Sequence, residues 1–337
     1  MASQKPTSHD VARLAGVSQT TVSYVMSGRR AVAPDTEQRV LRAMSELGYQ
    51  PNSGARALRS KKTNVIGTVI PYHPGADPGA QHQFIIALTT EARKYDYDIL
   101  LVTADEGAPG LRRVIDGALC DGLLIMEVAT RDPRTDVIHQ SGTPAVFIGI
   151  PENEDPILAI DSDYESAARQ SVELLRERGH RRISLLVPHD ESLTELNFIS
   201  RFRKEARACA NSLGISLLEH QVDVSYRHVA QYLSQLAPVA GDALLLAPVV
   251  SADDWCNALR DRGLIPGRDI SLIASSWDEE RAHTPDRPTC FDMRTQELTE
   301  RAIQLLITRI SSRPPDRPMR HLIEPRLRMG TTVMAAH

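Results

Sequence analysis

Side chains that could take part in chemistry fall into two groups in this 337-residue sequence: a basic group near the N-terminus and an acidic excess beyond it. Residues 1–62 hold ten Lys and Arg against four Asp and Glu, a net charge of +6. The other 275 residues hold 29 Lys and Arg against 39 Asp and Glu, a net charge of −10. A basic segment on an acidic body indicates contact with nucleic acid; the alternative is a charged terminus that contacts only solvent.

Polar side chains gather on one predicted helix, which runs from Gln19 to about Met26. Val22 and Val25 form its apolar stripe, and Ser18 supplies an N-cap for it. The residues left pointing outward are Gln19, Thr20, Thr21, Ser23 and Tyr24. An exposed polar face of this kind is what a recognition helix presents to the major groove of DNA.

Two more short helices are expected beside this one. Thr7 and Asp10 resemble a capping box, and the helix that they open stops at Gly16. Pro34 suits the first turn of the third helix, which stops at Gly48. The order of helix, glycine-containing turn and helix predicts a helix-turn-helix head, although many small helical bundles share this pattern.

Motifs for catalysis and metal binding are absent from the sequence. We find no Gly-x-Gly-x-x-Gly, Gly-Lys-Ser/Thr, His-Glu-x-x-His or Gly-x-Ser-x-Gly. The four cysteines are widely spaced, which argues against a zinc site or a disulfide framework and fits a reducing cytoplasm. His180 is interpreted as the end of a helix rather than an acid–base group. We therefore expect no enzyme, no cofactor and no metal.

The hydropathy pattern predicts neither a secretory signal nor a membrane span. Residues 1–10 are polar, and the longest apolar stretches, such as 243–250, are far shorter than the ~20 residues that span a bilayer. The expected location is the bacterial cytoplasm, with the protein associated with the nucleoid.

The acidic body alternates apolar runs with helical patterns. Strands are predicted at 65–70, 99–103, 122–126, 145–150, 157–160, 183–187, 217–222, 243–247 and 270–275. Helices are predicted at 83–95, 111–119, 164–178, 199–213, 228–236, 253–262 and 297–310. Alternation of this kind indicates parallel sheets with helices on both faces. Two sets of four or five strands predict two doubly wound α/β lobes beside a small all-α head.

Longer motifs in the sequence resemble the lactose-repressor/galactose-repressor (LacI/GalR) family of bacterial transcription regulators. Residues 9–28, HDVARLAGVSQTTVSYVMSG, and residues 32–71, which include GYQPN, match the family almost without gaps. GHRRISLL at 179–186 matches further along the chain. The resemblance implies a homodimer that binds double-stranded, pseudo-palindromic operator DNA and responds to a small molecule. Its body is expected to resemble periplasmic sugar-binding proteins.

The resemblance also assigns DNA contacts on the recognition helix. It places Gln19, Thr20 and Tyr24 at base edges, and Ser18, Thr21 and Ser23 at phosphates or helix caps. Tyr24 departs from the Arg that the family often has there. Because Tyr cannot bind a guanine bidentately, the operator is expected to lack that guanine. The alternative is that Tyr24 packs against the sugar-phosphate backbone.

A hinge helix is implied directly after the head. It is short, and Gly54 weakens it, so it is marginal on its own. The resemblance assigns DNA contacts there to Asn52, Ala55, Leu58 and Arg59, with Leu58 wedged into the minor groove. In the alternative, Leu58 is a linker residue that packs on the body.

The expected domains are a head at 1–50, a hinge and linker at 51–62 and a body at 63–337. Lobe 1 is expected at about 63–162 plus 292–322, and lobe 2 at about 163–290 plus 324–337. The chain is expected to cross between the lobes near 161–163, 290–292 and 321–324. No leucine heptads follow, so a tetramerising bundle of the lactose-repressor type is not expected.

Ligands of such sheets bind beyond the carboxyl ends of the strands and between lobes. By this rule the expected effector site contains Tyr72, Glu127, Asp163, Arg201, Trp277 and Asp278. Carboxylates and an Arg suit sugar hydroxyls, and a Trp face suits a sugar ring. Each residue also has a structural alternative. Asp163 could cap a helix, Glu127 could be a solvated loop acid, and Trp277 could belong to the core.

Three departures from the family pattern bear on the effector. Gly149 stands where an Asp is common, residues 248–251 lack the usual Asn-Asp, and the familiar Arg is either Arg201 or Arg203. The expected function is a sequence-specific transcription regulator, a repressor controlled by a sugar or related metabolite. The alternative is a sugar-binding protein with no regulatory role on DNA.

Overall fold

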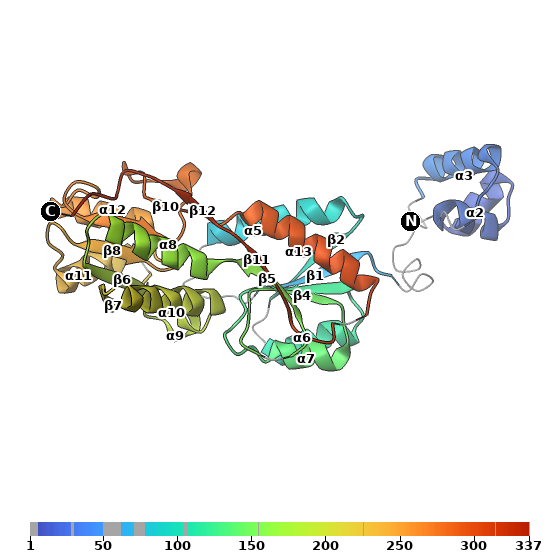
Figure 1. Ribbon diagram of the computed structural model, residues 1–337. Coiled ribbons are helices and arrows are strands. Elements are labelled where there is room, and N and C mark those ends of the chain that lie inside the picture. Colours follow the sequence, from blue (N-terminus) through green and yellow to red (C-terminus); the bar gives the residue numbers. More distant parts are fainter. Residues whose placement is uncertain are drawn as a thin grey trace. The chain divides into compact units, whose positions relative to one another are not determined.

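The computed structural model describes residues 6–27, 30–49, 62–70, 78–103, 107–153, 155–224, 226–313 and 315–336. The chain divides into two compact units, Met1–Asn64 and Val65–His337, which we call the head and the body (Figure 1). The predicted hinge contacts Asn52, Ala55, Leu58 and Arg59, and Tyr72 after the first strand, lie outside the described residues.

The head is a three-helix unit made of α1 (Ser8–Ala15), α2 (Gln19–Ser27) and α3 (Pro34–Leu47). Its buried core consists of small apolar side chains: Val11, Ala12, Ala15, Val22, Val40 and Ala43. Gly16 ends α1 at φ +64°, a left-handed conformation that glycine adopts without strain. The small core brings the three helices close together and leaves the opposite face of α2 to polar side chains.

Lobe 1 of the body is built on a parallel six-stranded sheet in the order β11-β5-β4-β3-β1-β2. Its strands are β1 (Val65–Ile70), β2 (Asp98–Thr103), β3 (Gly122–Ile125), β4 (Ala145–Ile148), β5 (Leu158–Ser162) and β11 (Met319–Ile323). Helices α5 (Pro78–Arg93) and α13 (Thr295–Ile310) cover one face, while α6 (Gly107–Asp116) and α7 (Arg134–Ser141) cover the other (Figure 1).

Lobe 2 is built on a parallel four-stranded sheet in the order β7-β6-β8-β9. The strands are β6 (Arg182–Pro188), β7 (Ser216–Val222), β8 (Ala243–Leu246) and β9 (Ser271–Ala274). Helices α8 (Tyr164–Glu177) and α10 (Asn197–Ser212) pack on one face, and α11 (Tyr226–Leu236) and α12 (Ala252–Asp261) on the other. The remaining elements are α9 (Glu191–Thr194), η1 (Glu279–Arg281) and an antiparallel pair, β10 (Cys290–Asp292) and β12 (Arg326–Arg328).

The predicted fold class is confirmed: parallel sheets with helices on both faces form the body, beside an all-α head. All nine predicted strands are present, with ends that differ by two residues or fewer. The prediction missed β10, β11, β12, α7 and α9. Among the described residues, no helix combines the length and the apolar character needed to cross a bilayer.

Candidate functional site

The N-terminal end of α2 is fixed by hydrogen bonds of the turn before it. The Ser18 hydroxyl accepts the Thr21 amide at 3.1 Å and lies 2.8 Å from the Thr21 hydroxyl, so Ser18 caps the helix. Upstream, the Thr7 hydroxyl accepts the Asp10 amide while the Asp10 carboxylate accepts the Thr7 amide, which confirms the capping box. Both caps satisfy amides that a helix start would leave unpaired, so they fix where α1 and α2 begin.

The predicted contact residues on α2 differ in exposure. Gln19 and Thr20 are exposed, whereas Thr21, Ser23 and Tyr24 are half-buried. The Gln19 amide donates a hydrogen bond to the Ser8 hydroxyl of α1 at 2.8 Å. The Arg30 guanidinium carbon lies 5.9 Å from the centre of the Tyr24 ring, within the range of a cation–π contact. Sequence reasoning missed Arg30, which brings a positive charge beside Tyr24.

Replacing Tyr24 with Arg is expected to change the preferred base at one position of each half-site, because a guanidinium can bind guanine bidentately. A new contact of this kind contributes about 1–3 kcal/mol of discrimination. Selection of binding sites from a random DNA pool with both proteins measures the change. An identical consensus for the two proteins would mean that residue 24 faces the DNA backbone or the head itself.

Two carboxylates of the predicted effector site are held by one helix. Glu127 follows β3 and accepts a hydrogen bond from the Gln81 amide at 2.5 Å. Asp278 follows β9 and accepts one from the Gln83 amide at 3.0 Å. Glu127 belongs to lobe 1 and Asp278 to lobe 2, and both glutamines lie near the start of α5. The structure therefore brings two predicted residues from separate lobes to one helix end, which sequence reasoning did not identify.

A second polar cluster lies where the chain first passes from lobe 1 to lobe 2. Arg201 of α10 contacts Asp161 of β5 at 2.7 Å and binds both carboxylate oxygens of Glu165 at 2.8 and 2.6 Å. Asp163 caps α8 by accepting the Ser166 amide at 2.9 Å. This cap is the structural alternative for Asp163, and its contact with an effector stays a prediction. Arg203 instead pairs with Glu219, so the two candidate arginines have separate surroundings.

The two carboxyls that contact Arg201 have pKa values shifted in opposite directions. Burial raises the pKa of Asp161 to about 7, although Arg201 and the Ser162 amide lower it. Burial also raises the pKa of Glu165, but there the hydrogen bonds and charge of Arg201 prevail, and the pKa lies below its ordinary value. Asp161 is 5% exposed, which explains why desolvation prevails at that carboxyl.

Stability is therefore expected to depend on the protonation of Asp161. The folded state binds the proton more tightly than the unfolded chain, whose carboxyl has its ordinary value of 3.8. The stabilisation is complete below that value and is lost as the pH rises through about 7. Compared with Asp161→Asn, the wild type should thus gain melting temperature as the pH falls from about 8 to about 5, measured by scanning fluorimetry. If the melting temperatures of the wild type and Asp161→Asn differ by the same amount across that pH range, the pKa of Asp161 is not raised.

Trp277 lies at the edge of the lobe 2 core, where it is half-buried. Its indole nitrogen donates to Asp253 at 3.0 Å, and His283 lies 3.4 Å from the other oxygen of Asp253. Packing and the indole bond fit the core role weighed for Trp277, and the sugar-stacking role stays a prediction. In the described part of the chain, no group of three or more His, Cys, Asp and Glu is arranged to hold a metal ion.

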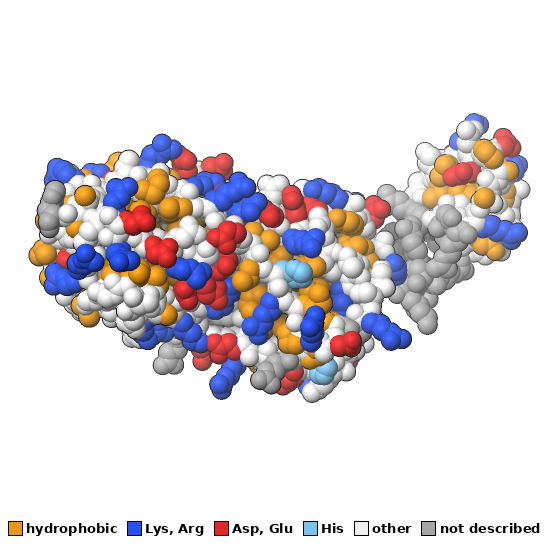
Figure 2. All heavy atoms as spheres, in the orientation of Figure 1, with side chains coloured by type: hydrophobic (Ala, Val, Ile, Leu, Met, Phe, Trp, Pro, Cys, Tyr) orange, Lys and Arg blue, Asp and Glu red, His pale blue; other side chains and the backbone are white. Residues whose placement is uncertain are grey.

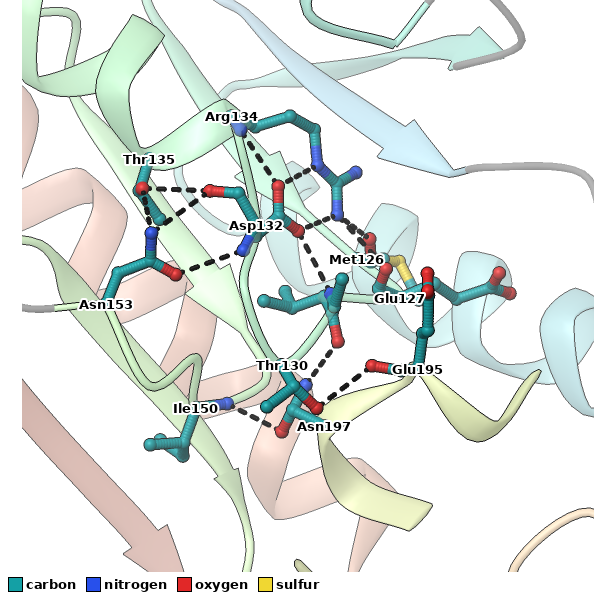
Figure 3. A network of polar contacts seen from close by, with 12 residues as sticks. Met126, Glu127, Thr130, Asp132, Arg134, Thr135, Ile150, Asn153, Glu195 and Asn197 are labelled. Carbon is teal, nitrogen blue, oxygen red and sulfur yellow. Dashed lines mark hydrogen bonds and ion pairs between the residues drawn. The ribbon is translucent and has the colours of Figure 1, made fainter. Parts of the chain in front are cut away.

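The loop after β3 is fixed by a buried ion pair. Asp132 and Arg134 are 1% and 6% exposed, and they contact each other at 2.6 and 2.9 Å (Figure 3). Arg134 also donates to the carbonyls of Met126 and Glu127 at 3.1 and 3.0 Å. The pair therefore holds the backbone that carries the Glu127 side chain.

On the face of the body in Figure 2, charges of both signs are interspersed, with no single basic patch.

A helix-turn-helix head joined to a two-lobed α/β body defines the class of transcription regulators that bind DNA and respond to a ligand. The model of bacterial regulatory proteins of the lacI family matches residues 7–52, and the model of the periplasmic binding protein-like domain matches residues 172–333. The HTH-type transcriptional regulator AglR of Rhizobium meliloti is 33% identical over 279 residues, which cover 78% of this chain and 76% of that protein. The chain belongs to the LacI family.

Other relatives extend this likeness over nearly the whole chain. HTH-type transcriptional regulator CelR of Thermobifida fusca is 25% identical, covering 96% of this chain and 97% of its own. A structure of the Lac repressor dimer bound to operator and an anti-inducer matches with a TM-score of 0.83 and 23% identity, covering 98% of this chain and 100% of that one. These relatives are named as transcription regulators, which favours a regulatory role on DNA over a sugar-binding protein without one. The structural likeness itself concerns the fold.

Proposed function

We propose that this regulator is a homodimeric repressor whose affinity for a pseudo-palindromic operator is controlled by a carbohydrate bound between the two lobes. The observation that carries the proposal is the pair of glutamines on α5, which join Glu127 of lobe 1 to Asp278 of lobe 2. A ligand that replaces these glutamine contacts with its own hydroxyls would touch both lobes at once. Its binding would then depend on how the lobes are arranged.

The chemistry of these groups supports a polyhydroxylated ligand. Carboxylates accept hydrogen bonds from hydroxyls, and Arg201 can donate to hydroxyl oxygens. One relative's structure is described as a CelR–cellobiose complex, with a TM-score of 0.66 and 22% identity, covering 97% of this chain and 100% of that one. We infer that a neutral mono- or disaccharide is the effector class here.

The head supports the DNA partner and the dimer. Gln19 and Thr20 are exposed at the start of α2, the part of a recognition helix that lies nearest the bases. A single helix-turn-helix contacts one half-site, so a pseudo-palindromic operator requires two copies of the chain. The assigned hinge contacts, Leu58 among them, would add minor-groove binding. A regulator of this kind acts in the cytoplasm, on the nucleoid.

The test uses the full-length protein in two steps. An operator is first selected from a random DNA pool, and its affinity is measured by fluorescence anisotropy at several salt concentrations. Thermal shift then screens neutral sugars, with cellobiose as the first probe, and each hit is added to the operator titration. The proposal predicts a symmetric consensus and an operator affinity that a sugar lowers. Binding without sequence preference, or operator binding that no sugar changes, would refute it.

A further inference from the structure

The two lobes contact each other through a short segment at the start of α10. Glu195, Leu196 and Asn197 of lobe 2 pair with Val128, Ala129 and Thr130 of lobe 1, with an antiparallel bridge between Ala129 and Leu196. The Thr130 amide donates to the Glu195 carbonyl at 2.8 Å, and the Asn197 amide donates to the Val128 carbonyl at 3.0 Å. We call these six residues, with Gly149 and Ile150, the interlobe latch; Figure 3 labels Thr130, Ile150, Glu195 and Asn197 of this set.

Asn197 uses both ends of its side chain in the latch. Its Nδ2 donates to the Val128 carbonyl at 2.5 Å, and its Oδ1 accepts the Ile150 amide at 2.9 Å. The two partners follow different strands of lobe 1, so one side chain ties both loops to lobe 2. Asn197 is 1% exposed. A buried amide whose nitrogen and oxygen both make hydrogen bonds favours one arrangement, because sliding of the lobes would break these bonds.

Gly149 leaves the space that Asn197 occupies. Its φ of +135° is a conformation that side chains disfavour, and a Cβ there would lie 2.6 Å from Asn197 Nδ2 and 2.7 Å from Val128 Cβ. The backbone of lobe 1 thus approaches Asn197 more closely than any other residue at 149 would allow. This accounts for a glycine at the position where the family pattern commonly has Asp.

Neighbouring contacts hold the latch in place on both sides. The Asp132 carboxylate accepts the Ala129 amide at 3.0 Å, so the buried pair with Arg134 supports the loop of lobe 1. On lobe 2, Leu196 packs with Leu193 and Ile199 in a small buried cluster. Each half of the latch is therefore fixed within its own lobe, and the hydrogen bonds between the halves report how the lobes are arranged.

We propose that Asn197 is a positioning residue that stabilises the effector-binding arrangement of the lobes before any effector is present. This inference rests on the proposed function only for the direction of the effector response. The latched arrangement is the one in which Gln81 and Gln83 of α5 contact Glu127 of lobe 1 and Asp278 of lobe 2, so it presents both lobes to a ligand. Loss of the latch lowers the competent fraction and thereby the apparent effector affinity.

The first experiment is hydrogen–deuterium exchange on the ligand-free, full-length protein. In Asn197→Ala the Ile150 amide loses its acceptor directly, so the informative amide is Thr130, whose acceptor, the Glu195 carbonyl, is unchanged. We expect the Thr130 amide to exchange roughly three- to tenfold faster if the latch opens as a unit. Amides of β3 and β8 serve as the folding control and should keep wild-type rates. Unchanged Thr130 exchange would overturn the proposal.

Gly149→Ala tests the same latch from lobe 1. The added methyl group should displace Asn197 and reproduce the faster Thr130 exchange. In a double-mutant cycle, Asn197→Ala should then add little to Gly149→Ala, because both remove one interaction. Thr130→Val is the mild, matched variant, since it removes only the hydroxyl bond to Glu195 at 3.0 Å and keeps the amide bond. Fully additive effects of the first two substitutions would contradict a shared latch.

The second experiment is an effector titration by calorimetry, with cellobiose or the best sugar from the screen. Asn197→Ala should weaken binding by up to about tenfold, and Thr130→Val by less. Unchanged or tighter sugar binding, together with faster Thr130 exchange, would overturn the proposal that the latch favours the effector-binding arrangement. If no sugar binds the wild type, the proposed function fails, whereas the exchange data still decide whether Asn197 positions the lobes.

Discussion

Arg134→Ala is expected to lower the free energy of unfolding of the body by about 3–5 kcal/mol. The substitution leaves Asp132, which is 1% exposed, without the guanidinium that contacts both of its oxygens. It also removes two hydrogen bonds to the carbonyls of Met126 and Glu127. A buried charge without its partner costs far more than the pair itself contributes. Urea unfolding followed by circular dichroism measures the loss.

Arg93→Ala is the matched control for this prediction. Arg93 pairs with Asp98 at 2.8 Å, but their side chains are 59% and 73% exposed. An exposed pair contributes at most about 1 kcal/mol, because water solvates both charges once they separate. If the two substitutions destabilise the protein equally, the buried pair at Asp132 has no special role.

Asp278→Ala is expected to weaken effector binding by roughly ten- to over a hundredfold. This corresponds to about 1.5–3 kcal/mol for a charge-assisted hydrogen bond. Asp278 is the carboxylate after β9 that accepts a hydrogen bond from Gln83 at 3.0 Å. Operator affinity without effector should stay close to that of the wild type, since the head is a separate unit. Calorimetry with the sugar that gives the largest thermal shift, beside anisotropy with operator DNA, measures both affinities.

Glu279→Ala provides the control, because it removes the same charge from the next residue. Glu279 is 59% exposed and pairs with Arg287 at 2.6 Å. It should leave effector affinity nearly unchanged. Equal effects of both substitutions would indicate a general electrostatic contribution, and loss of effector and operator binding together would indicate a folding defect. Wild-type effector affinity in Asp278→Ala would exclude Asp278 from the site.

The strands that the sequence predicts well are the ones buried on both faces. β3 and β8 consist entirely of buried residues, and unbroken apolar runs mark them clearly. β11 was missed because it is an edge strand with the sequence MRHLI, in which Met319 and Leu322 are 45% and 49% exposed. Its pairing with β5 joins Met319 to Leu158, a contact that no local pattern encodes.

The residues of the candidate site also divide into those that a local sequence pattern predicts and those that it does not. Glu127 and Asp278 were predicted because they follow strands, and the carboxyl ends of parallel strands share one edge of a sheet. Gln81 and Gln83 were missed because nothing in the pattern of α5 distinguishes them from solvated residues. Asn197 was missed as well, although one signal pointed to its surroundings. Gly149 departs from the family pattern, and only the three-dimensional approach of Asn197 explains that glycine.

The order of strands in lobe 1 has a consequence for synthesis on the ribosome. Strands β1 to β5 of this lobe emerge first, yet α13 and β11 emerge only after all four strands of the lobe 2 sheet. The lobe 1 core includes Leu298, Ala302, Ile303 and Leu306 of α13, so the sheet face that α5 and α13 share has only α5 as a cover until then. We therefore expect the lobe 2 sheet to fold while lobe 1 is incomplete. The nascent chain would meanwhile expose the apolar side chains that α13 later covers, and exposed apolar surface of this kind favours aggregation.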